Sequence, residues 1–128
     1  MAQKAVVKTE NAPAPFQGAP YSQGIVCGDL VFVSGQLGLD PSTGRLADGI
    51  AAQTEQVMQN IGAVLEASGS GLDRLVKTTI FLADLGDLAA LNEVYARHVG
   101  EAPPARSTFE VAALPSDALV EIEAVAHL

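Results

Sequence analysis

The chain has 128 residues, a length typical of one domain, and carries a formal net charge of -8 with only seven Lys and Arg residues. These cations form no run, which disfavours a nucleic-acid partner, and no stretch approaches the ~18 apolar residues of a membrane span. The single cysteine, Cys27, excludes a disulfide within the chain, and residues 1–16 lack the apolar core of a signal peptide, so we expect a cytoplasmic protein with a single domain spanning residues 1–128.

Short strands and a turn are predicted in the first part of the chain. Ala5 to Val7 is a short strand candidate. Gly24 to Cys27 and Leu30 to Ser34 are two further strand candidates, and they flank Gly28 and Asp29. A glycine-containing pair between two apolar runs is typical of a tight hairpin.

Two helices are predicted from apolar residues that recur at helical spacing. Ile50 to Ala67 has such a face, with Asp48 as a candidate cap at its start and Gly69 just past its end. Asp84 to Val99 is the second predicted helix. Its apolar stripe consists of Leu88, Leu91 and Tyr95, and Gly100 is expected to end it.

Three more strands are predicted, and they complete an α+β fold. Leu75 to Leu82 should place Val76, Thr78, Ile80 and Leu82 on one face. In the strand from Arg106 to Val111, the residues Arg106, Thr108 and Glu110 share a face. Leu119 to Ala126 alternates again, with Glu121 on the face opposite its most apolar positions. We therefore predict a mostly antiparallel sheet with both helices packed on one face.

Two charged residues within strands are candidates for a site. The Arg106 guanidinium stays charged and presents a planar fork that matches a carboxylate. Glu121 has a carboxylate that can accept a proton from an attacking water. The alternatives are an ordinary salt bridge from Arg106 to Glu110 or Glu121, and a solvated sheet face.

The backbone at Ser34 and Gly35 is a further candidate. We expect these residues to end a strand, where a glycine lets the backbone approach a ligand and donate its N–H. A simple turn at the end of the strand is the alternative. His98 and His127 are far apart in the chain and have no ligand spacing, so no metal site is expected.

Five segments of the chain occur in an order and at a spacing shared with a known family. They are Ala19–Gly24, Val33–Gln36, Val76–Leu82, Asn92 with Tyr95, and the PARS, EVA, LP and VEIEA elements of Pro104–Ala124. Together they resemble the RidA (YjgF-like) family of reactive-intermediate deaminases, over about Thr9 to Ala126. The resemblance implies a chorismate-mutase-like fold and a homotrimer. In that family, three subunits associate through the free sheet face, with active sites between neighbours.

The resemblance also implies a reaction and a set of site residues. The reaction is hydrolysis of enamine or imine acids, such as 2-aminoacrylate and 2-iminopropanoate, to 2-oxo acids and ammonia, without a cofactor. Arg106 matches the arginine that binds the substrate carboxylate, and Glu121 matches the glutamate that orients water. Tyr21 is placed at the mouth of the neighbouring subunit's pocket, while Asn92 either faces the pocket or is a polar surface residue. The substrate-binding candidates are Tyr21, Ser34, Gly35, Asn92 and Thr108.

The chain departs from the family pattern at one position of the site. Thr108 stands where many relatives have cysteine, and Cys27 lies in the early hairpin and does not replace it. Imine hydrolysis needs no covalent nucleophile, so the departure casts little doubt on deaminase activity. Two other functions stay open: a non-catalytic protein that binds 2-oxo acids, and a ribonuclease or translation inhibitor. The acidic charge argues against the second of these.

Overall fold

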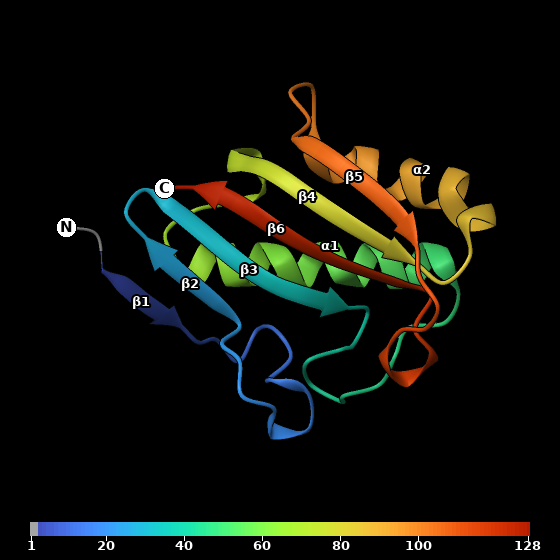
Figure 1. The fold of residues 1–128 in the computed structure, drawn as a ribbon, viewed down its shortest axis with the longest axis horizontal. Coiled ribbons are helices and arrows are strands. Elements are labelled where there is room, and N and C mark those ends of the chain that lie inside the picture. The colour runs from blue at the N-terminus through green and yellow to red at the C-terminus, as the bar shows by residue number, and fades with distance from the viewer. Residues whose placement is uncertain (1–2) are drawn as a thin grey trace.

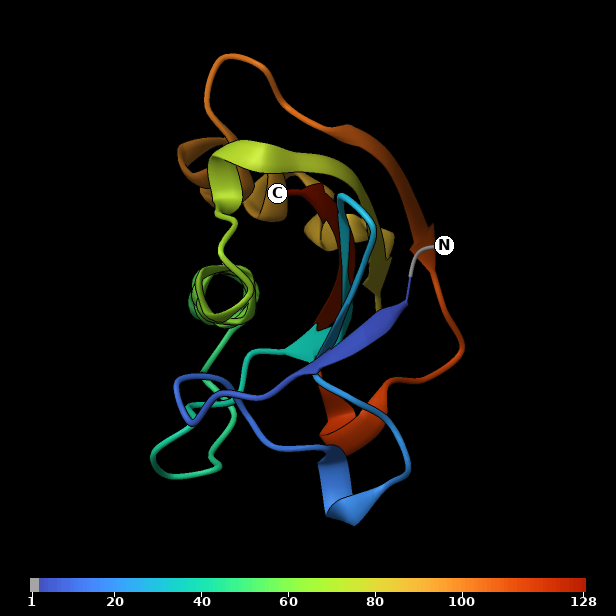
Figure 2. The same cartoon turned by 90° about the vertical axis from the view of Figure 1, so that its left-hand side faces the viewer.

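The computed structural model describes residues 3–128, in which two helices cover one face of a six-stranded sheet (Figure 1, Figure 2). The helices are α1 (Ile50–Ala67) and α2 (Leu88–Val99). The strands are β1 (Lys4–Val7), β2 (Gly24–Cys27), β3 (Leu30–Leu37), β4 (Leu75–Leu82), β5 (Ala105–Glu110) and β6 (Val120–His127). The strand order is β1-β2-β3-β6-β4-β5, and only β4 and β5 are parallel neighbours. The predicted α+β class is therefore confirmed.

The hydrophobic core lies between the sheet and the helices, because one side of each element is apolar. Helix α1 contributes the fully buried Val57, Met58, Ile61, Val64 and Leu65. Strand β6 contributes Val120, Ile122, Ala124 and Ala126, which alternate with less buried residues. Full burial of one such large side chain contributes about 1.5–3 kcal/mol. The other face of the sheet carries no helix (Figure 2). Among residues 3–128, no helix has the length and apolarity needed to cross a bilayer.

The predicted hairpin is present and joins β2 to β3. Cys27 pairs with Leu30, so Gly28 and Asp29 form a two-residue turn. Gly28 has a φ of +60°, a conformation that glycine adopts without steric cost. The strand after the turn is longer than predicted, since β3 continues to Leu37.

Strand β4 departs from the predicted alternation at its start. The ladder with β6 shifts register between Leu75 and Lys77, which is the pattern of a β-bulge. As a result, Leu75 is buried while Val76 is 45% exposed. The prediction that Val76 shares the buried face with Thr78 and Ile80 is therefore wrong.

The two ends of α1 test two capping predictions. The cap at the start is Gly49, with a φ of +87°, so the prediction for Asp48 is wrong. At the other end, Gly69 has a φ of +86° and follows the last turn, as expected. The Ser70 N–H donates to the Leu65 carbonyl, and the Gly69 N–H donates to the Glu66 carbonyl. This pair of bonds satisfies carbonyls that the helix leaves free.

Helix α2 begins later than predicted. A 3-10 turn at Leu85–Asp87 precedes it, and the Asp84 carboxylate accepts a hydrogen bond from the Gly86 N–H. Asp84 thus caps this turn, and the α-helix itself starts at Leu88. Gly100 ends the helix as expected, with a φ of +68°.

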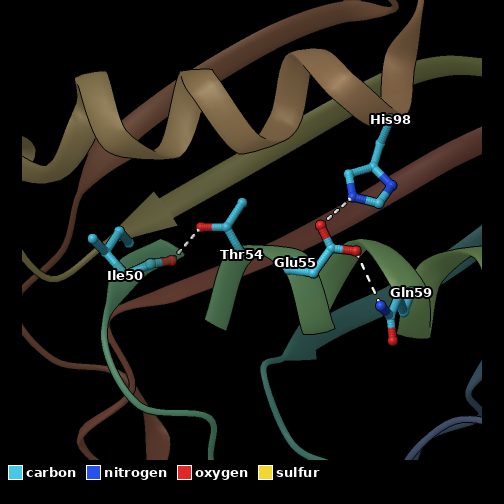
Figure 3. Close-up of polar contacts among 5 residues, drawn as sticks. All are labelled: Ile50, Thr54, Glu55, Gln59 and His98. Carbon is cyan, nitrogen blue, oxygen red and sulfur yellow. Dashed lines mark hydrogen bonds and ion pairs between the residues drawn. The ribbon is translucent and has the colours of Figure 1, made fainter. Parts of the chain in front are cut away.

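A hydrogen bond between side chains joins the two helices (Figure 3). His98 Nε2 of α2 lies 2.9 Å from Glu55 Oε1 of α1, and Gln59 Nε2 donates to the other Glu55 oxygen at 3.0 Å. The hydrogen bond with His98, and secondarily that from Gln59, lowers the pKa of Glu55. This contact fixes the C-terminal end of α2 against α1.

Candidate functional site

Arg106 lies on β5, on the side of the sheet that faces the helices. It pairs with Thr78 of β4, which is fully buried under α2, and residues paired across neighbouring strands point to the same face. The guanidinium carbon lies over the ring of Tyr95 from α2, 5.2 Å from the ring centre. Within residues 3–128, Arg106 makes no salt bridge. The alternative of a pairing with Glu110 or Glu121 is therefore absent from the structure.

The surroundings of Arg106 include a second polar group without a partner. Thr108 is two residues further along β5, so its side chain lies on the same face. Its hydroxyl oxygen is buried, and no hydrogen-bond partner exists for it within residues 3–128. Asn92 is exposed on α2, one turn before Tyr95, and so belongs to the same end of the helix surface. Arg106 and Thr108 lie on one face of β5, and Asn92 lies on the helix that packs against that face; we name these three candidate residues the β5 group.

Glu121 lies on the opposite face of the sheet. Its neighbours in sequence, Val120 and Ile122, are fully buried toward the helices, so Glu121 points the other way. The carboxylate is partly buried and receives no hydrogen bond or ion pair from any residue in 3–128. Burial raises the pKa of Glu121, and the negative charge of Glu123 raises it further. A partly buried carboxylate with a raised pKa is suited to accept a proton from water.

Gly35 forms the surface against which the Glu121 carboxylate rests. The register of β3 against β6 shifts between Val33 and Gln36, so Ser34 and Gly35 sit in a bulge. The prediction that Ser34 and Gly35 end the strand is wrong, because β3 continues to Leu37. A Cβ built on Gly35 would overlap the Glu121 carboxylate, so a larger residue here would displace that carboxylate from its present position. Such bulges re-aim backbone groups beside sites.

Tyr21 and Ser34 are tied to the same region by hydrogen bonds. The Ser34 hydroxyl donates to the Ser22 carbonyl, next to Tyr21 in the chain. The Tyr21 hydroxyl accepts a hydrogen bond from the Phe16 N–H at 2.6 Å, and its side chain is 42% exposed. Tyr21, Ser34, Gly35 and Glu121 form a second group, which we call the β6 group.

A pocket of about 490 Å³ lies beside Tyr21. It is lined by Lys8, Thr9, Glu10, Ala14, Pro15, Tyr21, Ser22 and Gln23. Gln23, which was not among the predicted site residues, lines this pocket and holds the adjoining loop in place. The buried Gln23 amide bonds the Thr9 N–H and the carbonyls of Thr9, Ala12 and Pro13. Gln23 lies two residues after Tyr21, and this proximity to a predicted site residue was the signal that could have identified it. A buried amide needs several hydrogen-bond partners, which here are backbone groups of the loop.

Within one chain the two groups do not meet. Glu121 pairs with Phe81 of β4, and Phe81 pairs with Phe109 of β5. Because Arg106 and Phe109 are three residues apart on one strand, Arg106 and Glu121 point to opposite faces of the sheet. Strand β4 also separates the strands that carry them. Residues 3–128 hold no cluster of three His, Cys, Asp or Glu side chains able to bind a metal ion.

Comparison with known proteins gives a consistent result. A family model described as Endoribonuclease L-PSP matches residues 9–128. The chain is 52% identical over 126 residues to the chloroplastic Reactive Intermediate Deaminase A of Arabidopsis thaliana, covering 98% of this chain and 66% of that protein. It is 50% identical over 125 residues to a RutC family protein of Pyrococcus horikoshii, covering 97% and 98%. The crystal structure of RidA from a Psychrobacter species superposes with a TM-score of 0.93 at 44% identity, covering 97% and 99%.

Proposed function

The chain belongs to the family of the RidA, YjgF and L-PSP proteins, and from this premise we propose that it hydrolyses reactive imine acids. The substrates are of the 2-aminoacrylate and 2-iminopropanoate type, and the products are the 2-oxo acid and ammonia. The name of the plant relative, a reactive intermediate deaminase at 52% identity, supports this reaction class. The observation that carries the proposal is a scarce cation, Arg106, held without a carboxylate partner among residues 3–128.

The proposed site combines the β5 group of one subunit with the β6 group of its neighbour. This arrangement follows because the two groups lie on opposite faces of one sheet, so a second copy of the chain is needed to bring them together. The candidates Asn92 and Thr108 then come from the same subunit as Arg106. Tyr21, Ser34 and Gly35 come from the subunit that supplies Glu121.

Each group has a defined role in the reaction. The Arg106 guanidinium binds the substrate carboxylate through two parallel hydrogen bonds, and the Gly35 N–H is a further donor. Glu121 accepts a proton from water as the water oxygen attacks the imine carbon. Glu121 returns that proton to the nitrogen, which gives the carbinolamine. The C–N bond of the carbinolamine then breaks as the C=O bond forms, the hydroxyl proton passes to the nitrogen, and ammonia leaves with both protons of the water. Because an imine is already electrophilic, positioning and one acid–base group suffice.

The free sheet face supports a homotrimer. Val6, Ile25, Phe32 and Val125 pair in one row across β1, β2, β3 and β6 on this face. Val6 is 55% exposed and Phe32 is 44% exposed, and contiguous exposed apolar surface marks an interface. We expect light scattering to give the mass of a trimer. An active monomer that is stable at micromolar concentration would contradict the shared site.

The reaction is tested by supplying the imine from another enzyme. A pyridoxal-phosphate dehydratase acting on serine or threonine releases such imines, and ammonia and 2-oxo acid are then measured with and without this protein. We expect the protein to accelerate ammonia release above spontaneous hydrolysis. A protein that binds the 2-oxo acid without acceleration would instead be a binding module. Varying the amino acid supplied identifies the preferred side chain.

Ribonuclease activity is a second candidate because the matching family model bears that description. The net charge of -8 argues against it, since RNA binding depends on clustered cations. RNA cleavage at physiological salt is the direct test. Cleavage that survives Arg106→Ala and Glu121→Ala would belong to a different site.

A further inference from the structure

The ring of Tyr95 lies directly beneath the one cation of the proposed site. We propose that Tyr95 is a positioning residue, which holds the Arg106 guanidinium in place for the substrate carboxylate through its aromatic face. The inference rests on the proposed function and deepens it, because it names the group that orients the carboxylate clamp. Tyr95 itself does not touch the substrate in this arrangement.

The contact suits an arginine that must bind a ligand. A cation over an aromatic face within about 6 Å of the ring centre is attracted to it, and the observed distance is 5.2 Å. No residue in 3–128 accepts a hydrogen bond or forms a salt bridge with the guanidinium, so its donors are left for an incoming carboxylate. A carboxylate partner would occupy those same donors and compete with the substrate. The ring fixes the cation without this competition.

The ring is itself held firmly. The Tyr95 hydroxyl and the Thr78 hydroxyl lie 2.6 Å apart in the core, and Tyr95 is only 5% exposed. Thr78 is the residue that pairs with Arg106 across β4 and β5, so the anchor and the cation lie on adjacent strands. The hydrogen bond between His98 and Glu55 also links the helix that carries the ring to α1 (Figure 3). The Arg106 side chain therefore rests on a rigid support.

The attraction between Arg106 and Tyr95 does not come from a charged phenolate. Burial raises the pKa of Tyr95, despite the opposing effects of the Thr78 hydrogen bond and of the Arg106 charge. The phenol consequently stays neutral at physiological pH, and the attraction comes from the ring. A long arginine side chain that is already restrained loses less freedom when it binds a ligand.

A double-mutant cycle separates positioning from ordinary core packing. The variants are Tyr95→Leu, Arg106→Met and their combination, with Tyr95→Phe as the variant that keeps the ring. Ile61→Val is the control, because Ile61 is fully buried on α1, a helix that carries no residue of the β5 group or the β6 group. Ammonia release gives kcat and KM, calorimetry gives the Kd of 2-oxobutanoate, and thermal unfolding gives Tm.

We expect Tyr95→Leu to raise KM and the Kd of 2-oxobutanoate about fivefold, with a smaller change in kcat, as loss of a cation–π contact implies. In the Arg106→Met background, which has no cation over the ring, Tyr95→Leu should change the Kd of 2-oxobutanoate less than about twofold. Tyr95→Phe, which keeps the ring, should retain most of the wild-type affinity, and Ile61→Val should lower Tm without changing KM.

The positioning role would be overturned if Tyr95→Leu weakened the binding of 2-oxobutanoate by the same factor with and without Arg106. It would also be overturned if the binding weakened only in proportion to the fall in Tm. Either result would leave the deaminase proposal intact. A wild-type protein that neither releases ammonia nor binds 2-oxobutanoate would overturn the proposed function, and the positioning role with it. Binding of 2-oxobutanoate with the expected coupling but without ammonia release would support the positioning role and reject only catalysis.

Discussion

Two inactive variants should restore each other's activity if the site lies between subunits. Arg106→Ala removes the clamp from the β5 group, and Glu121→Ala removes the base from the β6 group. The two side chains of one chain point to opposite faces of its sheet, so each intact site draws Arg106 from one subunit and Glu121 from the next. After random assembly of a 1:1 mixture, half of the subunits supply an intact Arg106 and half supply an intact Glu121. About a quarter of the sites should then be intact.

The assay is ammonia release after the two variants are unfolded together, refolded as a mixture and assayed as the whole trimer population, without separation of hybrid trimers from homotrimers. Each variant refolded alone is the background. A second mixture, of wild-type chains with chains that carry both substitutions, distinguishes the geometries. It should give about a quarter of wild-type activity for a shared site and about half for a site within one chain. Hybrid oligomers that show no activity above background would refute the shared site.

Three further predictions concern single residues. Arg106→Lys should lower kcat/KM about 10- to 100-fold at unchanged Tm, because it loses the bidentate fork and a charge-assisted hydrogen bond contributes about 1.5–3 kcal/mol; wild-type kcat/KM with a lower Tm would make Arg106 a structural residue. Iodoacetamide should leave most activity intact, since Thr108 stands where many relatives have cysteine and Cys27 ends strand β2, away from the β6 group; inactivation that substrate prevents would contradict this. Burial raises the pKa of Glu121, so the folded protein holds this proton more tightly than the unfolded chain, and ionised Glu121 opposes folding above that pKa. Glu121→Gln should therefore raise Tm at neutral pH and much less at acidic pH while activity is lost, and an equal or lower Tm at neutral pH would argue against the raised pKa.

Local patterns in the sequence identified most of the fold. Gly28 with Asp29 predicted the hairpin, and the apolar spacing in Ile50–Ala67 predicted α1 with its observed bounds. The errors lie where backbone geometry overrides side-chain pattern. A bulge reverses the faces of Leu75 and Val76, and nothing in these two adjacent apolar residues marks it. At the start of α1, Asp48 was the better capping residue by type, but the chain turns at Gly49.

The arrangement of the candidate site required the sheet topology. Alternation correctly grouped Arg106 with Thr108 and set Glu121 opposite the apolar positions of its own strand. It gave no information on how the two strands relate, because β4 is inserted between β5 and β6 and pairs with β5 in parallel. Only this register places Arg106 and Glu121 on opposite faces. Similarly, the contact between Arg106 and Tyr95 joins residues that local patterns cannot connect.

The division of the proposed site gives assembly a chemical role. On one face of the sheet, Arg106 has no acceptor within residues 3–128, and on the other face Glu121 has no donor. Partly buried charged side chains without partners lower the free energy of unfolding, and residues that lower stability in this way are expected at functional sites. In the proposed trimer both side chains lie at the same subunit interface, where Arg106 binds the substrate carboxylate and Glu121 accepts a proton from water. Separation of the subunits would therefore abolish the deaminase activity, because neither face of one chain holds both groups.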